Sequence, residues 1–300
     1  MNLPKISIII PSYNHGCYLE QAVQSVLTQN YAHKELIVVD GASTDESQEI
    51  LKRYAPDFTH WESCPDRGQS HAINKGFSHA TGEIITFLSS DDLYLPGVFN
   101  FVVEKFQIYP QCGAIVGGFH FVDENNNIFE VFNPPRLPYQ SPIDLTLIPP
   151  EDWRLHQVAT FYTKHALGEV GRYVREDLNY VMDRELLFRV CKRFEIVLDN
   201  RPYGAFRRHP SSKSMNAGIP FSDEFAQLYL EAKSGDKRED HTRDKIARFF
   251  RAKGYLHFAK YHSDKKESKK AIINAIKISP LLLIRKSIVF QIIKLFCIKR

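Results

Sequence analysis

The strongest chemical signal in the sequence is a pair of adjacent carboxylates, Asp91 and Asp92, that follows a short apolar run from Ile84 to Leu88. The run predicts a buried strand that carries both acids at its C-terminal end. In open α/β sheets, ligands bind outside the carboxyl ends of the strands. Two oxygen ligands there suit Mg²⁺ or Mn²⁺ carrying a phosphate group. The alternative is a strand-to-loop turn with solvated acids.

Two earlier predicted strands also end in polar residues. Lys5 to Ile10 predicts a strand buried on both faces, and a polar loop from Pro11 to Gly16 follows it. Glu35 to Val39 predicts a second strand that runs into Asp40. An acid at that place commonly binds ribose hydroxyls in nucleotide-binding sheets. Taken alone, Asp40 is more typical of a turn before glycine.

Apolar residues at helical spacing follow each of these strands. Ser43 and Glu46 have the spacing of a capping box, which predicts that the second helix starts there. Strands that alternate with helices imply a parallel sheet with right-handed crossovers. Such a sheet would present Ser12, Asp40 and Asp91 to one crevice, which is the outline of a nucleotide site.

Three further segments carry candidate groups. Arg67 follows a short predicted strand from Phe58 to Glu62, and it faces either a phosphate or solvent. The basic, hydroxyl-rich segment from Phe206 to Ser214 is either a cover for a pyrophosphate or an exposed loop. Asp183 lies beside the apolar face of a helix expected from Asp177 to Lys192. An acid beside a buried face can have a raised pKa and act as a base, although alone it is more typical of an ordinary surface acid.

The second half of the chain changes pattern after the first four strands. Alternating residues predict a hairpin, and a proline-rich stretch without periodicity predicts a mobile loop. A strand and two late helices are also expected. These elements are the hairpin at 113–123 and 128–132, the loop at 134–150, the strand at 157–162, and the helices at 222–233 and 243–260.

Charge is unevenly distributed along the 300 residues. The net charge is +4, but Asp264 to Arg300 contains ten Lys or Arg and two Asp or Glu, which leaves a net charge of −4 for residues 1–263. The mildly acidic body shows no basic face with interleaved aromatics, so nucleic acid is excluded as its partner. The basic tail favours an anionic membrane surface. Five scattered cysteines indicate reduced thiols in a cytosolic compartment, and no signal peptide is expected.

The last apolar stretch, Leu281 to Ile298, carries Arg285, Lys286 and Lys294 on one side of a helical wheel. Charges inside the stretch argue against a helix that spans a membrane. They favour an amphipathic helix lying in the membrane surface, at the inner face of the cell membrane. The alternative is a C-terminal helix packed on the body or on a second subunit, so a homodimer stays open.

Four motifs occur in order and together resemble glycosyltransferase family 2, the inverting GT-A enzymes that use nucleotide-sugar donors. They are Ser-Ile-Ile-Ile-Pro-Ser-Tyr-Asn (7–14), Val-Val-Asp-Gly-Ala-Ser-Thr-Asp (38–45), Asn-Lys-Gly with Ala-Thr-Gly-Glu-Ile-Ile (74–85), and Leu-Ser-Ser-Asp-Asp (88–92). Several linked motifs are far more specific than any one. The resemblance covers about residues 5–215.

This resemblance implies an α/β GT-A fold, Rossmann-like, with a mostly parallel central sheet flanked by helices. Residues 1–215 would form the catalytic domain, with a nucleotide-sugar-binding half (1–110) and an acceptor-binding half (111–215). Residues 216–300 would form a helical C-terminal region with the basic amphipathic tail. The implied function is metal-dependent, inverting transfer of a sugar from a nucleotide sugar, with a UDP-sugar expected, to a polysaccharide or lipid-linked acceptor.

The resemblance also assigns roles to residues. Asp183 would be the catalytic base, and His156 and Gln157 would line the acceptor side. Mn²⁺ or Mg²⁺ would be held by Asp91, with Asp92 and His209 in support. The donor would be bound by Pro11, Ser12, Tyr13, Asp40, Arg67, Ser90, Asp91, Arg208 and Lys213.

Two positions depart from the family pattern. Ser89 stands where the family often has Asp or Asn, which weakens the expected ribose contact. Glu185 stands where a second Asp is frequent, so the identity of the base is open between Asp183 and Glu185. Ser89 favours an alternative, a catalytically silent protein that binds a nucleotide sugar or scaffolds a polysaccharide assembly complex. A nucleotidyltransferase would need a Gly-rich basic loop after the first strand, which Pro11 to Gly16 does not supply.

Overall fold

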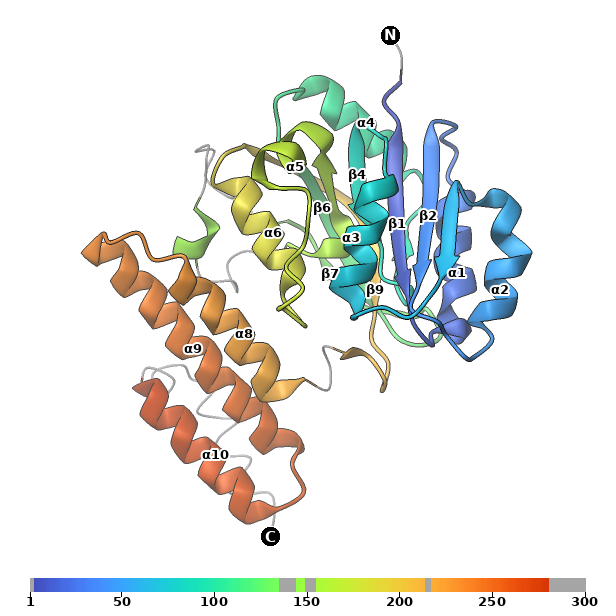
Figure 1. The fold of residues 1–300 in the computed structure, drawn as a ribbon. Coiled ribbons are helices and arrows are strands. Elements are labelled where there is room, and N and C mark those ends of the chain that lie inside the picture. Colours follow the sequence, from blue (N-terminus) through green and yellow to red (C-terminus); the bar gives the residue numbers. More distant parts are fainter. Residues whose placement is uncertain (1–2, 135–143, 149–154, 214–216, 281–300) are drawn as a thin grey trace. The chain divides into compact units, whose positions relative to one another are not determined.

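The computed structural model describes residues 3–134, 144–148, 155–213 and 217–280 (Figure 1). The chain divides into two compact units, residues 1–209 and residues 210–300. This division lies close to the boundary predicted at residue 215. Much of the predicted mobile loop at 134–150, and all of 281–298, lie outside the described residues.

Four parallel strands form one side of the sheet in the first unit. They lie in the order β3-β2-β1-β4 and comprise β1 (Ile6–Ser12), β2 (Lys34–Asp40), β3 (His60–Ser63) and β4 (Ile84–Phe87). Every residue of β1 is buried, as a run of β-branched residues predicts for a strand covered on both faces. The parallel α/β architecture expected from the sequence is confirmed.

Helices cover both faces of these strands. Since side chains alternate along a strand, Ile8 points to one face and Ile9 to the other. Ile8 shares its hydrophobic core with residues of α1 (Gly16–Leu27), α2 (Ser47–Tyr54) and α4 (Val98–Ile108).

On the opposite face, α3 (Gln69–His79) packs directly on β1 and β2 of the sheet (Figure 1). A Cβ atom at Gly76 of α3 would lie 2.3 Å from Cγ2 of Ile9, so only glycine allows this close approach. The sheet is therefore enclosed on both sides, and its polar groups are left at its edge.

The remaining strands extend the sheet beyond β4 and make it mixed. β8 is antiparallel to both β4 and β6, and β9 is parallel to β6. The predicted hairpin is confirmed, because β6 and β7 pair antiparallel. The bounds are β5 (Leu93–Tyr94), β6 (Ala114–Val122), β7 (Ile128–Phe132), β8 (Thr160–Thr163) and β9 (Ile196–Arg207).

Two predicted helix starts are wrong. The second helix begins at Ser47, not at a box formed by Ser43 and Glu46, because the Ser43 hydroxyl bonds the Asp40 carboxylate instead. The helix predicted from Asp177, α6, spans Met182–Cys191, since the Asp177 carboxylate binds the Arg175 guanidinium at 2.6 Å in the preceding loop.

Four short elements complete the described part of the first unit. The strand predicted from Gln157 starts as a 3₁₀ turn before β8. The elements are η1 (Ala55–Asp57), η2 (Leu145–Leu147), η3 (Gln157–Ala159) and α5 (Lys164–Val170).

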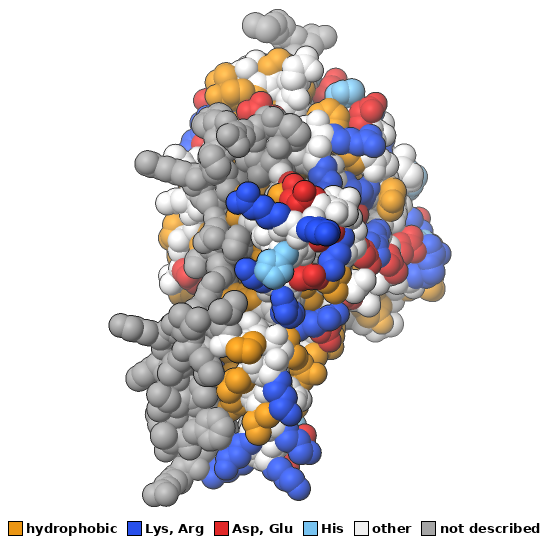
Figure 2. All heavy atoms as spheres, turned by 90° about the vertical axis from the view of Figure 1, so that its left-hand side faces the viewer, with side chains coloured by type: hydrophobic (Ala, Val, Ile, Leu, Met, Phe, Trp, Pro, Cys, Tyr) orange, Lys and Arg blue, Asp and Glu red, His pale blue; other side chains and the backbone are white. Residues whose placement is uncertain are grey.

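The second unit is helical. It contains α8 (Gly218–Glu231), α9 (Lys237–Tyr261) and α10 (Lys265–Ile278), and Asp236 and Asp264 cap the last two helices through side-chain hydrogen bonds. Basic and hydrophobic side chains lie side by side on the visible face of these helices (Figure 2). Among the described helices, none combines the length and apolar character needed to cross a membrane.

Candidate functional site

The carboxyl ends of β1, β2 and β3 lie level at one edge of the sheet. The register pairs Ser12 with Asp40 and Asp40 with Ser63. The backbone N–H of Gly41 donates to the Ser12 carbonyl at 2.9 Å, and that of Cys64 donates to the Asp40 carbonyl at 3.0 Å. The loops after these strands therefore start from a fixed common edge.

The turn after β4 brings a carboxylate and an imidazole together. Oδ2 of Asp91 lies 3.1 Å from Nε2 of His209, two residues after the end of β9. The Asp91 side chain is 14% exposed, whereas the His209 side chain is fully buried. Ser90 beside it is buried and lies 2.9 Å from Nδ1 of His15, in the loop after β1.

The Arg207 side chain stabilises the turn after β4. It is fully buried, and its Nε donates to the Asp91 carbonyl at 2.9 Å. A second guanidinium nitrogen donates to Gln21 at 2.9 Å, and the group stacks on the Tyr18 ring, 4.7 Å from its centroid. The Tyr18 ring in turn lies 4.5 Å from the ring of His209. The buried Arg207 guanidinium thus fixes the backbone that presents Asp91.

Asp92 does not share the surroundings of Asp91. It is 1% exposed, and its Oδ1 accepts from the Arg207 backbone N–H at 3.0 Å. Burial and the neighbouring Asp91 carboxylate raise the pKa of Asp92 well above its usual range. Asp92 was predicted to support the metal, and the structure places it as a buried anchor between two strand ends.

Asp40 is also buried, and the protein satisfies its carboxylate. Ser43 donates through its backbone N–H at 2.8 Å and its hydroxyl at 2.5 Å, the Ser63 hydroxyl donates at 2.6 Å, and the Gln48 amide donates at 3.2 Å. Asp40 has an exposed fraction of 0%, and its predicted contact with the ribose or base stays a prediction. Its geometry is that of a residue that organises the loop after β2.

The loops after β1 and β2 are tied to each other. The Asn14 backbone N–H donates to the Ser43 hydroxyl at 2.8 Å, and the Asn14 side chain accepts from Thr44 at 2.9 Å. Asn14 (φ 49°) and Ala42 (φ 63°) both adopt the left-handed region, which costs energy for a non-glycine residue. Strain of this kind is typical of loops held in a functional conformation.

The predicted donor-binding residues of the β1 loop differ in exposure. Pro11 is buried, and the buried Ser12 hydroxyl has no hydrogen-bond partner among the residues that the structure describes. The Tyr13 side chain is 62% exposed at the edge of the sheet. Arg67 is exposed and forms an ion pair with Glu176 at 2.8 Å, so its guanidinium is engaged.

Asp183 lies in the first turn of α6, with its side chain 19% exposed. Burial raises the pKa of Asp183 above its ordinary value, although the Arg184 guanidinium, 3.9 Å away, opposes this shift. Glu185 is bound by both Nε and a terminal nitrogen of Arg189, at 2.8 and 2.9 Å. A carboxylate held by a guanidinium fork is a poor proton acceptor, so the geometry favours Asp183 as the base.

The two predicted acceptor-side residues take different positions. The Gln157 amide is buried and donates to the Phe87 carbonyl at the end of β4. His156 packs on the Phe206 ring at 4.4 Å. Burial, with Arg184 and Arg208 nearby, lowers the pKa of His156 to about 3. His156 is therefore a neutral imidazole at neutral pH.

The two basic residues predicted to bind the donor after β9, Arg208 and Lys213, belong to different units. Arg208 lies with its guanidinium 3.7 Å from the centroid of the Phe121 ring, on the hairpin. Lys213 belongs to the second unit and is exposed. The predicted contacts of Arg208 and Lys213 with the donor stay predictions.

The chemistry of Asp91 and His209 fits a divalent cation. Within the described ranges, no three His, Cys, Asp or Glu side chains cluster as a complete metal site. Mg²⁺ and Mn²⁺ in nucleotide sites are commonly held by one or two protein side chains, with substrate phosphates and waters as the remaining ligands. A carboxylate oxygen and an imidazole nitrogen that already face each other at 3.1 Å meet that smaller requirement.

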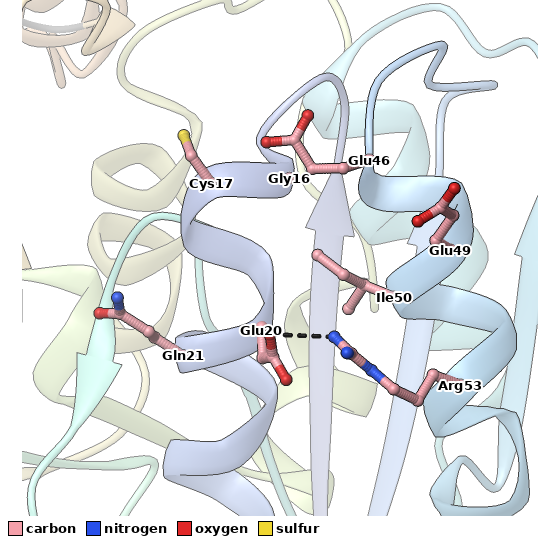
Figure 3. A pocket seen from close by; sticks show the side chains of 8 residues that line it. All are labelled: Gly16, Cys17, Glu20, Gln21, Glu46, Glu49, Ile50 and Arg53. Atoms are coloured by element: carbon pink, nitrogen blue, oxygen red, sulfur yellow. Dashed lines mark ion pairs between the residues drawn. The ribbon is translucent and has the colours of Figure 1, made fainter.

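A cavity of about 480 Å³ lies between α1 and α2 (Figure 3). None of the predicted site residues lines it. Glu20 and Arg53 form an ion pair at 2.9 Å across it, and Glu46 and Glu49 leave it with excess negative charge. Such a lining repels a diphosphate, so this cavity is not the donor site.

Sequence reasoning missed His15, Tyr18 and Arg207. His15 and Tyr18 stand in and just after the polar loop that follows β1, where the sequence singled out only Pro11 to Tyr13. Arg207 was treated as part of a basic loop, but the alternating pattern of β9 extends to it and turns its side chain inward. The run of apolar residues before Arg207 was the signal that could have identified a strand.

Known proteins resemble this chain in sequence and in fold. The Glycosyl transferase family 2 model matches residues 7–171. An uncharacterized glycosyltransferase of Nostoc sp. is 39% identical over 122 residues, which cover 40% of this chain and 37% of that protein. The match therefore spans little more than a third of that relative's length.

Two solved structures share the fold. S. aureus TarS, crystallised with UDP-GlcNAc, has a TM-score of 0.64 at 18% identity and covers 96% of this chain and 83% of its own. A mannosyltransferase of Pyrobaculum calidifontis in complex with GDP-Man and Mn²⁺ has a TM-score of 0.61 at 17% identity, covering 100% and 89%. The family model spans more than half of the chain, so the protein belongs to glycosyltransferase family 2 and is a glycosyltransferase with a GT-A-like fold.

Proposed function

We propose that the protein is a metal-dependent, inverting glycosyltransferase that transfers a sugar from a nucleoside-diphosphate sugar to a hydroxyl of a glycan or lipid-linked acceptor. The observation that carries this proposal is the contact between Asp91 and His209 at the edge of the sheet where strands β1 and β2 also end. Two proteins of similar fold, one crystallised with UDP-GlcNAc and one in complex with GDP-Man and Mn²⁺, support the class of donor.

Asp91 and His209 would hold Mn²⁺ or Mg²⁺ against the donor diphosphate. Bound there, the cation supplies electrostatic stabilisation of the charge that develops on the leaving nucleoside diphosphate. Arg207 keeps the Asp91 backbone in place through its bond to the Asp91 carbonyl. Because Asp92 is buried, it contributes by holding the turn and not by contacting the cation.

Asp183 would accept the proton of the incoming acceptor hydroxyl. The acceptor oxygen then bonds to the anomeric carbon as the bond from that carbon to the diphosphate breaks, which inverts the configuration. A raised pKa brings a carboxylate closer to the value of an effective general base. His156 lies within electrostatic reach of Arg184, the neighbour of Asp183, which supports an acceptor site on the side of the base.

The experiment is a donor panel. Purified protein is incubated with UDP-, GDP- and dTDP-sugars and Mn²⁺, with and without EDTA, and nucleoside diphosphate release is measured. We expect release from one donor that EDTA suppresses and that Asp91→Asn and Asp183→Asn both reduce. Asp57→Asn, an exposed acid on η1, is the matched control. Release that persists in EDTA would contradict metal dependence.

A second candidate is a protein that binds a nucleotide sugar without transferring it. Ser89 favours this candidate, since its hydroxyl, 3.4 Å from the Gln69 amide, stands where the family often has Asp or Asn. Calorimetry separates the two: tight donor binding without release in the presence of candidate acceptors would support the silent protein. Release by the wild type would exclude it.

A lipid-linked acceptor at the inner face of the cell membrane is the partner that the tail favours. The net charge of +8 over residues 264–300 suits an anionic surface. The full-length protein should cosediment with phosphatidylglycerol vesicles at low salt and not with phosphatidylcholine vesicles. Equal binding to both, or binding that salt does not weaken, would contradict an electrostatic membrane contact.

A further inference from the structure

The helix α10 packs on α9 through one face. Ala271, Ile272 and Ala275 are buried in a hydrophobic core that they share with α9. An α-helix has 3.6 residues per turn, so side chains that recur three or four positions apart lie on the same face. The face opposite this core therefore contains a second set of side chains with the same spacing, from Lys266 to Lys277.

This opposite face carries lysines around one isoleucine, and we call it the basic face of α10. Its five residues fall within an arc of about 100° around the helix axis. All five are exposed, and they are Lys266, Lys269, Lys270, Ile273 and Lys277. The Ile273 side chain is 48% exposed, and Lys270 also binds Glu267 at 2.6 Å. An apolar side chain thus lies among four ammonium groups.

The charges at the start of α9 are balanced, in contrast to those of the later helical residues. At the start of α9, the buried Arg243 binds Glu239 at 3.2 Å and Asp240 at 3.0 Å. From Lys245 to Ile278, the chain has ten Lys or Arg and two Asp or Glu. Acids of the same segment can neutralise at most two of these ten positive charges. A surface of the second unit therefore keeps an excess of positive charge.

The sign of the charge favours one kind of partner for the basic face. The basic face of a second copy has the same sign and repels it. Residues 281–300 contain five Lys or Arg and no Asp or Glu, so their net charge repels it as well. An anionic lipid surface suits both features of the basic face, because it attracts the lysines and accepts an apolar side chain among its headgroups.

Resting on the proposed lipid-linked acceptor, we propose that the basic face of α10 lies on an anionic membrane surface, with Ile273 inserted between the lipid headgroups. The helix axis then runs in the plane of the membrane, since the basic face extends from the first turn of α10 to its last. Lysine suits this geometry, because its methylene stem lies along apolar surface while its ammonium group reaches the phosphates. The contact therefore uses a folded helix of the second unit, in addition to the tail at 281–298.

The test is cosedimentation of the full-length protein with phosphatidylglycerol vesicles at low salt. Lys266→Gln combined with Lys277→Gln removes two charges from the basic face, and α10 should stay folded because glutamine and lysine have similar helix propensities. Lys52→Gln combined with Lys192→Gln removes two exposed lysines of the first unit and is the control matched in charge. The variant of the basic face should bind on the order of tenfold more weakly than the wild type, and the control should bind as the wild type does.

A second variant, Ile273→Ser, tests insertion separately from charge. It keeps every lysine and should weaken vesicle binding by on the order of fivefold, because the apolar side chain no longer enters the membrane. The matched control is Ile108→Ser, since Ile108 is 57% exposed at the end of α4 in the first unit. Equal binding by Ile273→Ser and the wild type would contradict the insertion.

The outcomes separate this inference from the proposed function. Wild-type vesicle binding that the double variant of α10 retains would overturn the inference and leave the proposed membrane partner standing, with its contact elsewhere in the chain. If the wild type does not bind anionic vesicles, both fail, whereas the donor panel tests the transferase activity independently. Light scattering on the same proteins measures self-association, and a double variant that loses dimers but not vesicle binding would assign the basic face to a second copy.

Discussion

Two strands of one sheet, β2 and β4, lead into an aspartate, and the two aspartates have opposite surroundings. Asp40 is fully buried, and Ser43, Gln48 and Ser63 donate four hydrogen bonds to it. Asp91 is partly exposed and faces His209 at 3.1 Å. The same residue type near the carboxyl ends of two parallel strands is held by four donors in one case and is a candidate metal ligand in the other.

The difference lies in the neighbours that fill the acceptor sites of each carboxylate. An ionised carboxylate has about four such sites; Oδ2 of Asp40 accepts three hydrogen bonds, and its Oδ1 accepts one. Four donors therefore hold Asp40 in place, whereas the carboxylate of Asp91 faces the imidazole of His209. The number of donors that adjacent strands and loops supply therefore distinguishes the two acids.

The largest expected effect concerns a third carboxylate, Asp183, which would act as a base. Asp183→Asn should lower turnover by on the order of 10²–10⁴-fold while donor affinity stays the same. Because burial raises the pKa of Asp183 and the base must be deprotonated, the wild-type rate should rise as pH increases through that raised value. The rate–pH profile of the variant should lack this rise; an identical profile would assign the base elsewhere.

Asp91→Asn should have the second largest effect, a reduction in turnover by on the order of 10²–10³-fold. The free energy of unfolding should change by no more than about 1 kcal/mol, because the side chain is partly exposed. Parallel urea titrations and nucleoside diphosphate release measure both quantities. A variant that unfolds easily but turns over normally would reverse the roles assigned to the two aspartates.

Asp40→Ala should show the opposite pattern. Removing the carboxylate leaves the donors of Ser43, Ser63 and Gln48 without their acceptor, which costs about 3 kcal/mol of unfolding free energy. Cooled below its unfolding transition, the variant should still show release that EDTA suppresses. Loss of metal dependence with unchanged stability would show that Asp40 contacts the donor.

The smallest expected effect is that of Ser63→Ala on the free energy of unfolding. The variant removes one of the donors to Asp40, at 2.6 Å, and should cost about 1 kcal/mol. Urea unfolding measures this change, and turnover at low temperature should remain at the wild-type value. A large loss of turnover would mean that the freed Asp40 oxygen disturbs donor binding directly.

The parallel half of the fold could be predicted because its signals are local. The apolar runs of β1, β2 and β4 and the helical spacing after them are set by neighbours in the sequence, and the structure confirms them. The hydrogen bond from Ser63 to Asp40 could not be predicted, since Ser63 lies on the next strand. The capping-box prediction failed for the same reason: Ser43 found a partner in Asp40 that its sequence spacing to Glu46 does not reveal.

The sequence pointed to Asp91 as a candidate site residue, but not to the residues that hold its turn in place. Asp91 and His209 were both singled out, and the structure brings them together although 118 positions separate them. Arg207 and His15 escaped notice because their partners, Asp91 and Ser90, are distant in sequence. Contacts between residues that are distant in sequence leave no periodic pattern from which they could be predicted.

The most direct test of the metal-dependent donor site is a calorimetric titration of UDP and GDP into wild-type protein and Asp91→Asn, with Mn²⁺ and with EDTA. For the nucleotide that binds, Mn²⁺ should tighten wild-type binding by on the order of 10–100-fold and should have no effect on Asp91→Asn. Asp57→Asn should behave as the wild type. Equal tightening by Mn²⁺ in Asp91→Asn would contradict the assignment of the metal to the turn after β4.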